Sequence, residues 1–342
     1  MNFASDNAYG AAPEIVAALA AANTGTVASY GEDELTASVT RRLCEIFERE
    51  VAVFPVVTGT AANSLSLATV SPPYGAIFCH EESHIAVDEC AAPEFFSGGA
   101  KLVHLKGKGA KITPDAVSAA LVHYRRGVHS AQPAAISITQ ATELGTVYGA
   151  DEIAALAELA HREGMALHMD GARFANALAH LNCRAADITW RAGVDVLSFG
   201  ATKNGALCAE AVVFFNESLV RDFEYRRKRG GHLISKMRFI SAQLDAYLEN
   251  DRWLAQARAA NALATRLASN LAAIPEVEIA EAAEANEVFA FLPDPMVARL
   301  REAGAKFYDW AEPREGRTLV RLVLSFLTPD DDVQRFIQLA QR

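Results

Sequence analysis

Two short apolar runs, residues 165–169 and 194–199, each stop abruptly at small or polar residues. Runs of this kind are typical of buried parallel strands that end at the edge of a sheet. The segment between them is long enough for one helical crossover, so both strands can run in the same direction. The pattern therefore predicts that Asp170 and Lys203, which follow the two runs, meet at one edge of a parallel sheet.

The region between residues 51 and 215 alternates predicted strands with predicted helices. Further strand candidates are 51–57, 76–79, 134–139 and 211–215, and helix candidates are 114–126 and 151–163. Alternation of this kind predicts an α/β fold with a mostly parallel sheet.

A polar break at residues 249–251 separates this region from a different pattern. Beyond the break, the sequence predicts a small α+β domain with a long alanine-rich helix at 253–272, strands at 277–279, 288–292 and 318–324, and helices at 295–303 and 329–339. The chain has 342 residues, half of them hydrophobic, which is enough for a large core and a smaller appended domain. The expected division is an N-terminal arm at 1–15, a large domain at 16–250 and a small C-terminal domain at 251–342.

Charge and cysteine usage exclude several classes of protein. The formal net charge of -10 argues against a surface for nucleic acid or for an anionic membrane. No apolar run reaches membrane-spanning length, and the first ten residues lack the pattern of a signal peptide. The five cysteines show no CxxC spacing and the nine histidines no HExxH spacing, so we expect neither a disulfide framework nor a metal site. A reduced, cytoplasmic setting is the expectation that follows.

An acid and an amine brought to one sheet edge allow two interpretations. Asp170 and Lys203 could form a salt bridge at the rim. Alternatively, the lysine holds pyridoxal phosphate as a Schiff base while the aspartate pairs with the pyridine nitrogen, which makes the ring an electron sink. The strand-to-helix junction at residues 57–67 could cradle one phosphate with its free backbone N–H groups and the hydroxyls of Thr58 and Thr60. The same threonines could equally be ordinary helix caps.

Two histidines, one arginine and one basic run are further candidates, each with an ordinary alternative. His84 and His129 could act as a general base or be satisfied surface residues. Arg321 lies in an otherwise apolar strand and needs an anion, which is either a protein carboxylate or a substrate carboxylate. The basic run at 226–232 is either a solvated turn or a loop that reaches a phosphate, in its own subunit or in a neighbour.

Taken in order, these motifs resemble those of the low-specificity L-threonine aldolase family of fold-type I pyridoxal-phosphate enzymes. The resemblance covers nearly the whole chain, and its motifs are SD at 5–6, YG at 30–31, TGT at 58–60, HMDGAR at 168–173, SFGATKNG at 198–205 and VRLV at 320–323. The segments TQATE at 139–143 and TKNGA at 202–206 depart from the family pattern and indicate a divergent branch.

The resemblance implies pyridoxal phosphate as the cofactor, bound in the large domain. Lys203 would be the Schiff-base lysine, Asp170 the partner of the pyridine nitrogen, and His84 the group stacked on the ring. The other cofactor-binding residues that it implies are Thr58, Gly59, Thr60, Arg173 and Thr202, with Lys228 and Lys236 reaching across a subunit interface. A homodimer or homotetramer with shared active sites is therefore also implied.

The resemblance further implies the reaction, which is cleavage of L-threonine, L-allo-threonine and related β-hydroxy-α-amino acids such as phenylserine into glycine and an aldehyde. The substrate-binding residues that it implies are Ser5, Tyr30, Arg173 and Arg321. His84 or His129 would be the base. A β-eliminating lyase or an aminotransferase acting on a small amino acid would use the same Lys203 and Asp170, and is the alternative.

Overall fold

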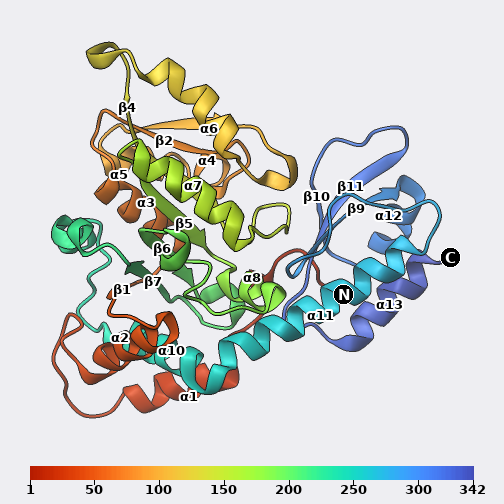
Figure 1. Cartoon of the computed structure of the whole chain (residues 1–342). Coiled ribbons are helices and arrows are strands. Elements are labelled where there is room, and N and C mark those ends of the chain that lie inside the picture. The colour runs from red at the N-terminus through yellow and green to blue at the C-terminus, as the bar shows by residue number, and fades with distance from the viewer.

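The large domain is built around a seven-stranded sheet, which the computed structural model, describing residues 1–342, places at the centre of the domain (Figure 1). The strand order is β1-β7-β6-β5-β4-β2-β3. The strands are β1 (Ala52–Val56), β2 (Gly75–His80), β3 (Lys101–Leu105), β4 (Gln132–Thr139), β5 (Ala166–Gly171), β6 (Val196–Gly200) and β7 (Glu210–Phe214). Only β7 runs antiparallel to its neighbours, so the predicted mostly parallel α/β sheet is confirmed.

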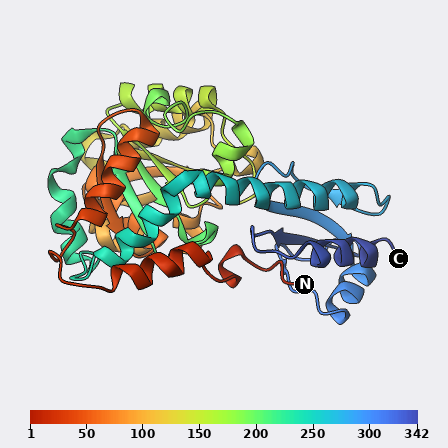
Figure 2. The same ribbon diagram turned by 90° about the horizontal axis from the view of Figure 1, so that it is seen from below.

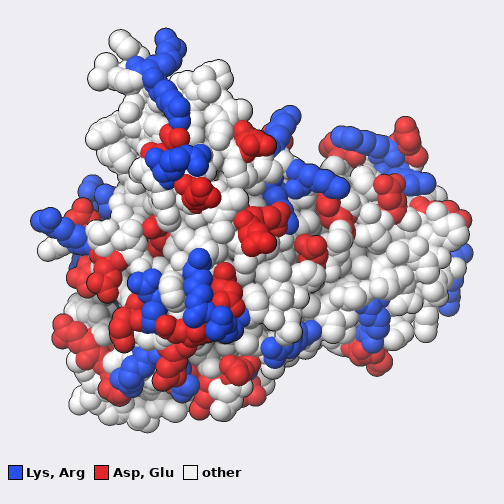
Figure 3. Space-filling view, viewed as in Figure 1, with Lys and Arg blue, Asp and Glu red and all other residues white.

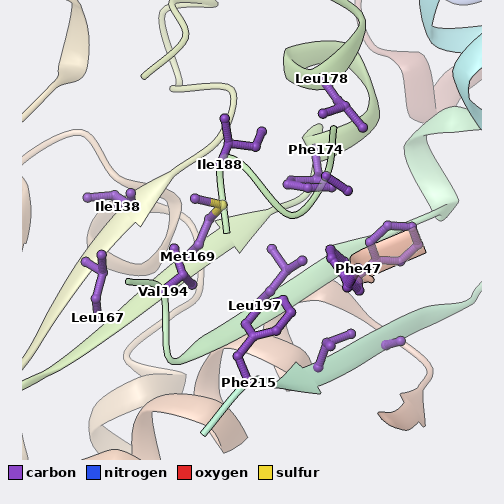
Figure 4. Packing of buried hydrophobic residues seen from close by; sticks show 14 of the residues in the cluster. Phe47, Ile138, Leu167, Met169, Phe174, Leu178, Ile188, Val194, Leu197 and Phe215 are labelled. Atoms are coloured by element: carbon purple, nitrogen blue, oxygen red, sulfur yellow. The ribbon is translucent and has the colours of Figure 1, made fainter. Parts of the chain in front are cut away.

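Helices cover both faces of this sheet, because its strands carry apolar side chains on both sides. Successive residues of a strand point to opposite faces. Leu197 therefore joins Phe174 and Met169 in the main core (Figure 4), whereas Val196 packs with Leu65 of α3 in a second cluster. The helices of the large domain are α1 (Pro13–Ala22), α2 (Glu34–Phe47), α3 (Gly59–Val70), α4 (His84–Val87), α5 (Ala92–Ser97), α6 (Pro114–Leu121), α7 (Ala150–Arg162), α8 (Phe174–Leu181), α9 (Phe223–Arg229) and α10 (Arg238–Leu248).

The small domain contains a four-stranded antiparallel sheet in the order β10-β11-β9-β8. Its core combines Val288 and Leu322 from the sheet with Phe336 and Leu300 from the helices that cover it. The elements are β8 (Glu278–Ile279), β9 (Glu287–Pro293), α12 (Asp294–Glu302), β10 (Tyr308–Asp309), β11 (Arg317–Val323) and α13 (Asp330–Ala340). This is the small α+β domain that the sequence predicts.

Helix α11 (Arg252–Ala272) joins the two domains and extends from the large sheet over the small one (Figure 2). Its first turns place Trp253 and Ala257 in the core of the large domain. Further along, Ala264 and Leu267 belong to the core of the small domain. The division expected after residue 250 thus falls just before a helix that both domains share.

The N-terminal arm also contacts both domains, and its first residues lie beside the small domain in Figure 2. Phe3 is fully buried in the small core, and its backbone N–H donates to the carbonyl of Lys306 at 2.8 Å. A few residues later, the N–H of Ala12 donates to the carbonyl of Gly205, next to Lys203, at 2.9 Å. The arm therefore passes along the boundary at which the two domains meet.

Two helical segments are shorter than the sequence indicates. Of the helical crossover expected between the two apolar runs, at residues 172–191, only α8 is α-helical, because Asn182 adopts a left-handed conformation with φ of 48° and ends the helix. The predicted helix 114–126 ends as an α-helix at Leu121 and continues as 3-10 turns up to Gly127, whose φ is 57°. Strand β3 and helix α5 are additions that the sequence patterns did not predict.

The surface carries both signs of charge. Figure 3 shows lysine and arginine side chains interspersed with aspartate and glutamate over one face of the molecule. Every helix is too short or too polar to cross a membrane.

Candidate active site

A cavity of about 760 Å³ lies where the arm, the large domain and the small domain meet. It opens beyond the carboxyl ends of β5 and β6, where ligand sites of parallel α/β sheets are normally found. Ten of the residues singled out from the sequence line it together: Ser5, Thr58, Gly59, Thr60, His84, Asp170, Arg173, Thr202, Lys203 and Arg321. The cavity therefore brings together residues that are more than 300 positions apart in the chain.

Asp170 is the last residue but one of strand β5 and is 4% exposed. Its Oδ2 atom accepts a hydrogen bond from Nδ2 of Asn63 at 2.8 Å, and its Oδ1 atom accepts one from the N–H of Ala172 at 3.0 Å. Both donors are neutral, so this buried carboxylate has no cationic partner in the protein. A buried charge is stable only when it is compensated, which makes Asp170 suited to a positively charged group bound in the cavity.

Lys203 lies in the turn Thr202–Asn204 that follows β6 and is half-buried in the cavity wall. Gly205 ends this turn with φ of 119°, a conformation that favours glycine. The amine of Lys203 forms no ion pair or hydrogen bond, so the rim salt bridge with Asp170 does not form. An unpaired amine and an uncompensated carboxylate thus face the same cavity.

The amino end of α3 forms another wall of the cavity. Thr58 is the N-cap, and its Oγ1 atom accepts a hydrogen bond from the N–H of Ala61 at 3.1 Å. The N–H groups of Gly59 and Thr60 belong to the first turn, where no intrahelical acceptor is available. A side chain built on Gly59 would meet no atom within 4 Å, so the approach to these groups is open. The capping interpretation is confirmed, and the free N–H groups of the same helix end suit an anion.

His84 begins the short helix α4 and presents its imidazole to the cavity. Its Nδ1 atom lies 2.8 Å from Oε1 of Glu89, and its backbone N–H donates to Oε1 of Glu143 at 2.7 Å. The hydrogen bond to Glu89 raises the pKa of His84 above 6.5, burial opposes this rise, and the charge of Asp170 adds to it. The histidine is therefore poised to exchange a proton near neutral pH.

Two arginines lie where the arm and the small domain close the cavity. Arg173 donates to Asp6 through Nε at 2.9 Å and lies 3.3 Å from Glu287 through Nη1. Arg321, on β11, donates to the carbonyl of Ala4 through Nη2 at 3.3 Å, while its Nε atom is buried without a partner. Arg321 therefore lines the cavity with a single hydrogen bond to the protein, whereas Arg173 is already paired with two acids.

Several acidic residues of the site were not singled out from the sequence. Burial raises the pKa of Glu143 to about 7, with a further contribution from the charge of Asp170. Burial likewise raises the pKa of Glu210 to about 7, although the N–H of Ala201 donates to its Oε2 atom at 2.8 Å. Both line the cavity. The sequence signal that could have identified Glu210 was its position at the start of the predicted strand 211–215. In the structure this residue pairs with Gly200 at the end of β6.

Four of the predicted site residues lie outside this cavity. His129 is exposed in a turn before β4, at the amino end of a strand whose carboxyl end faces the site, so its own chain does not bring it to the cavity. Tyr30, Lys228 and Lys236 lie together elsewhere. The amine of Lys228 is 4.7 Å from the ring centre of Tyr30, and the N–H of Tyr30 donates to the carbonyl of Ser235 at 3.0 Å.

Known proteins resemble this chain along nearly its whole length. Residues 2–295 match the family model described as Beta-eliminating lyase. The chain is 45% identical over 308 residues to the low specificity L-threonine aldolase of Pseudomonas sp. (strain NCIMB 10558), covering 90% of this chain and 89% of that protein. It is 43% identical over 339 residues to the enzyme of the same name from Pseudomonas aeruginosa, covering 99% and 96%.

Solved structures agree with the sequence relatives. The structure of Leishmania major threonine aldolase superposes with a TM-score of 0.94 at 27% identity and covers 100% of this chain and 98% of that one. Serine palmitoyltransferase of Sphingomonas wittichii, at 16% identity and a TM-score of 0.72, covers 100% of this chain and 86% of its own, and shares the fold. The chain therefore belongs to the beta-eliminating lyase family and, within it, to the low-specificity L-threonine aldolases.

Proposed function

We propose that this protein cleaves L-threonine, L-allo-threonine and related β-hydroxy-α-amino acids such as phenylserine into glycine and an aldehyde, with pyridoxal phosphate as its cofactor. One observation carries the proposal: the unpaired amine of Lys203 and the uncompensated carboxylate of Asp170 face one cavity beside an open helix amino end. The amine suits the aldehyde of this cofactor, the carboxylate suits its ring nitrogen, and the helix end suits its phosphate.

The residues of the cavity fit each part of this cofactor. Lys203 would hold it covalently through the side-chain amine, and Asp170 would keep its ring nitrogen protonated. The phosphate would bind at Thr58, Gly59, Thr60 and Thr202, which all line the cavity. When bound, the cofactor supplies an electron sink for the electron pair that is released at Cα.

The substrate would be held by its carboxylate at the end of the cavity near the small domain. Arg321 would supply this contact through Nη1, which has no partner in the protein, and Arg173 and Ser5 lie at the same cavity. Fixing the carboxylate orients the Cα–Cβ bond. A substrate held in its reactive orientation reacts faster.

His84 would accept the proton of the β-hydroxyl group. Loss of this proton lets the oxygen form the carbonyl of the departing aldehyde while the Cα–Cβ bond breaks. A proton delivered to Cα then completes glycine, so one proton leaves the substrate and one returns. A base of this kind contributes roughly 10²- to 10⁴-fold to the rate.

Product analysis tests the reaction. The purified protein, supplied with pyridoxal phosphate and L-threonine, should release glycine and acetaldehyde in equal amounts. Lys203→Ala should lose this activity and the visible absorbance of the bound cofactor, whereas Lys106→Ala, which changes an exposed lysine, should keep both. A keto acid formed in place of glycine would favour the β-eliminating lyase or the aminotransferase.

We also propose a homodimer or homotetramer in which Tyr30, Lys228, Lys236 and His129 serve the site of a neighbouring copy. The support is that these residues are absent from the cavity of their own chain, and that Lys228 and Lys236 are exposed. Mixing Lys203→Ala with the double variant Lys228→Ala/Lys236→Ala should restore part of the activity if the sites are shared. No gain above the sum of the two separate variants would contradict sharing.

A cytoplasmic location is the remaining part of the proposal. All five cysteines are free, and burial raises the pKa of Cys79 to about 12, which keeps that thiol protonated. Free thiols are the usual state of cysteine in a reducing compartment. Fractionation of cells that express a tagged chain would test this location.

A further inference from the structure

A continuous chain of hydrogen bonds connects His84 to Asp170 through Glu89, which lies behind the cavity wall, and Asn63, which lines the cavity. Nδ1 of His84 lies 2.8 Å from Oε1 of Glu89. The same oxygen accepts a hydrogen bond from Nδ2 of Asn63 at 2.8 Å, and Nδ2 of Asn63 also donates to Oδ2 of Asp170 at 2.8 Å. Asn63 and Glu89 are both almost fully buried. Two carboxylates are therefore held by one amide group, and one of them holds the histidine.

We propose that Glu89 is a positioning residue that fixes the tautomer and the charge of His84, and that Asn63 ties this pair to Asp170. The inference rests on the proposed function, in which His84 is the base. Glu89 itself does not line the cavity, so it acts through the imidazole and does not touch the substrate.

The donors and acceptors in this series of hydrogen bonds fix the direction of each bond. The amide nitrogen of Asn63 carries two hydrogens, so it can donate to Glu89 and to Asp170 together, and both carboxylate oxygens must accept. With Oε1 of Glu89 as an acceptor, Nδ1 of His84 must donate its hydrogen. In the neutral imidazole, Nε2 then carries the lone pair, which is the atom available to take a proton from a substrate.

Glu89 has the strongest hold on His84 among the charged groups around it. Asp88 lies 3.6 Å from Nε2, but its side chain is 80% exposed, so water and salt screen its charge. Glu143 contacts the backbone N–H of His84, not the ring. Asp170 and Lys203 act on the ring with opposite signs, and Glu82 is exposed at the cavity rim. Only Glu89 combines burial, charge and a direct hydrogen bond to the imidazole.

Nuclear magnetic resonance of the histidine side chains tests the proposal without any turnover. In protein labelled with 15N-histidine, the signal absent from His84→Asn identifies His84, and its titration gives the pKa. Glu89→Gln keeps the shape and removes the charge, so the pKa of His84 should fall by about 1 to 2 pH units. The nitrogen shifts of the wild-type protein should report a protonated Nδ1. Asp88→Asn, which removes an exposed charge beside the same ring, should move the pKa far less.

Enzyme kinetics provide the second measurement. Since the base must be neutral, the acid limb of kcat/KM for L-threonine should move to lower pH in Glu89→Gln by the same amount as the pKa of His84. Glu89→Asp keeps the charge, so the pKa of His84 should stay near its wild-type value. This variant still tests the inference if Glu89→Gln does not fold. An unchanged His84 titration in a folded Glu89→Gln protein would overturn the inference. Absence of threonine cleavage in the wild type would instead overturn the proposed function and leave the titration result intact.

Discussion

Arg321 lies against two aromatic rings at the cavity wall. Its guanidinium carbon is 4.7 Å from the ring centre of Trp310 and 5.5 Å from that of Tyr308. Stacking of this kind holds a guanidinium group in place without using its hydrogen-bond donors. The Nη1 atom, which has no hydrogen-bond partner and is not enclosed as Nε is, is then free for the substrate carboxylate.

Loss of this arginine should weaken substrate binding and leave the cofactor in place. A hydrogen bond to a charged group contributes about 1.5 to 3 kcal/mol, so Arg321→Gln should raise KM for L-threonine by roughly 10- to 150-fold, with a smaller change in kcat. Steady-state kinetics and a cofactor titration measure the two effects. Arg317→Gln, on the same strand but paired with Glu278 at the surface, is the control and should behave as wild type. A matching loss of cofactor affinity in Arg321→Gln would point to a structural arginine.

Site residues were predictable from the sequence where their residue type is unusual for the segment that surrounds them. Asp170 and Lys203 follow apolar strands, and Arg321 interrupts one, so each stands out from its surroundings. Glu89 and Asn63 did not stand out, because a glutamate in a polar segment or an asparagine in a helix normally faces water. Only the folded chain shows that Asn63 is buried between two carboxylates.

The amino end of α3 offers a prediction at the level of an element. Thr58→Ala removes the cap of α3 and should lower the free energy of unfolding by about 1 kcal/mol. It also removes a hydroxyl from the proposed phosphate site, so the dissociation constant of pyridoxal phosphate should rise about tenfold. Urea unfolding of the cofactor-free protein and a cofactor titration measure the two effects.

Helix α6 provides the matched control for this prediction. Thr113 caps it through the same contact, with Oγ1 accepting from the N–H of Ala116 at 3.2 Å, and lies outside the cavity. Thr113→Ala should therefore lose similar stability and keep its cofactor affinity. Equal cofactor affinity in Thr58→Ala and Thr113→Ala would remove Thr58 from the phosphate site.

Helices and strands were predictable from the sequence where an apolar pattern fits only one kind of element. The strands at β5 and β6 fall within two residues of their predicted bounds, since continuous apolar runs of that length suit a buried strand. Helix α11 was predicted at almost its full length, but not its role as a link, because its apolar stripe looks the same whichever core it packs against. The proposed role of Lys228 in the site of a neighbouring copy is likewise not testable from a pattern along one chain.

At the scale of the whole molecule, one buried network ties the three parts of the chain together. Asp6 of the arm accepts hydrogen bonds from Arg173 of the large domain and from Asn286 of the small domain, the latter at 3.1 Å. Glu287 of the small domain lies on the other side of Arg173, with neither carboxylate oxygen hydrogen-bonded. The same arginine therefore has one well-satisfied acidic partner and one poorly satisfied partner.

Removing these two acids should have unequal effects on stability. Asp6→Asn leaves the buried Arg173 undercompensated and should lower the free energy of unfolding by about 3 kcal/mol at neutral pH. Glu287→Gln removes a charge that was not hydrogen-bonded, so it should cost much less or stabilise the fold. Urea unfolding of the cofactor-free variants measures both. Equal losses in the two variants would show that the network does not distinguish its acids.

The pH dependence should separate the two acids further, because their pKa values shift in opposite directions. Burial raises the pKa of Asp6, but Arg173, Lys203 and the hydrogen bond from Asn286 outweigh it and leave the value below 3.8. The stability that Asp6 contributes is therefore present above pH 3.8 and is lost as the pH falls further. Burial raises the pKa of Glu287 above 4.5 despite Arg173, so its ionisation costs stability as the pH rises from 4.5 through the folded value. In unfolding measurements across this range, the free energy of unfolding of Glu287→Gln should rise relative to that of the wild type as the pH rises. The stability that Asp6→Asn loses relative to the wild type should become smaller only below pH 3.8.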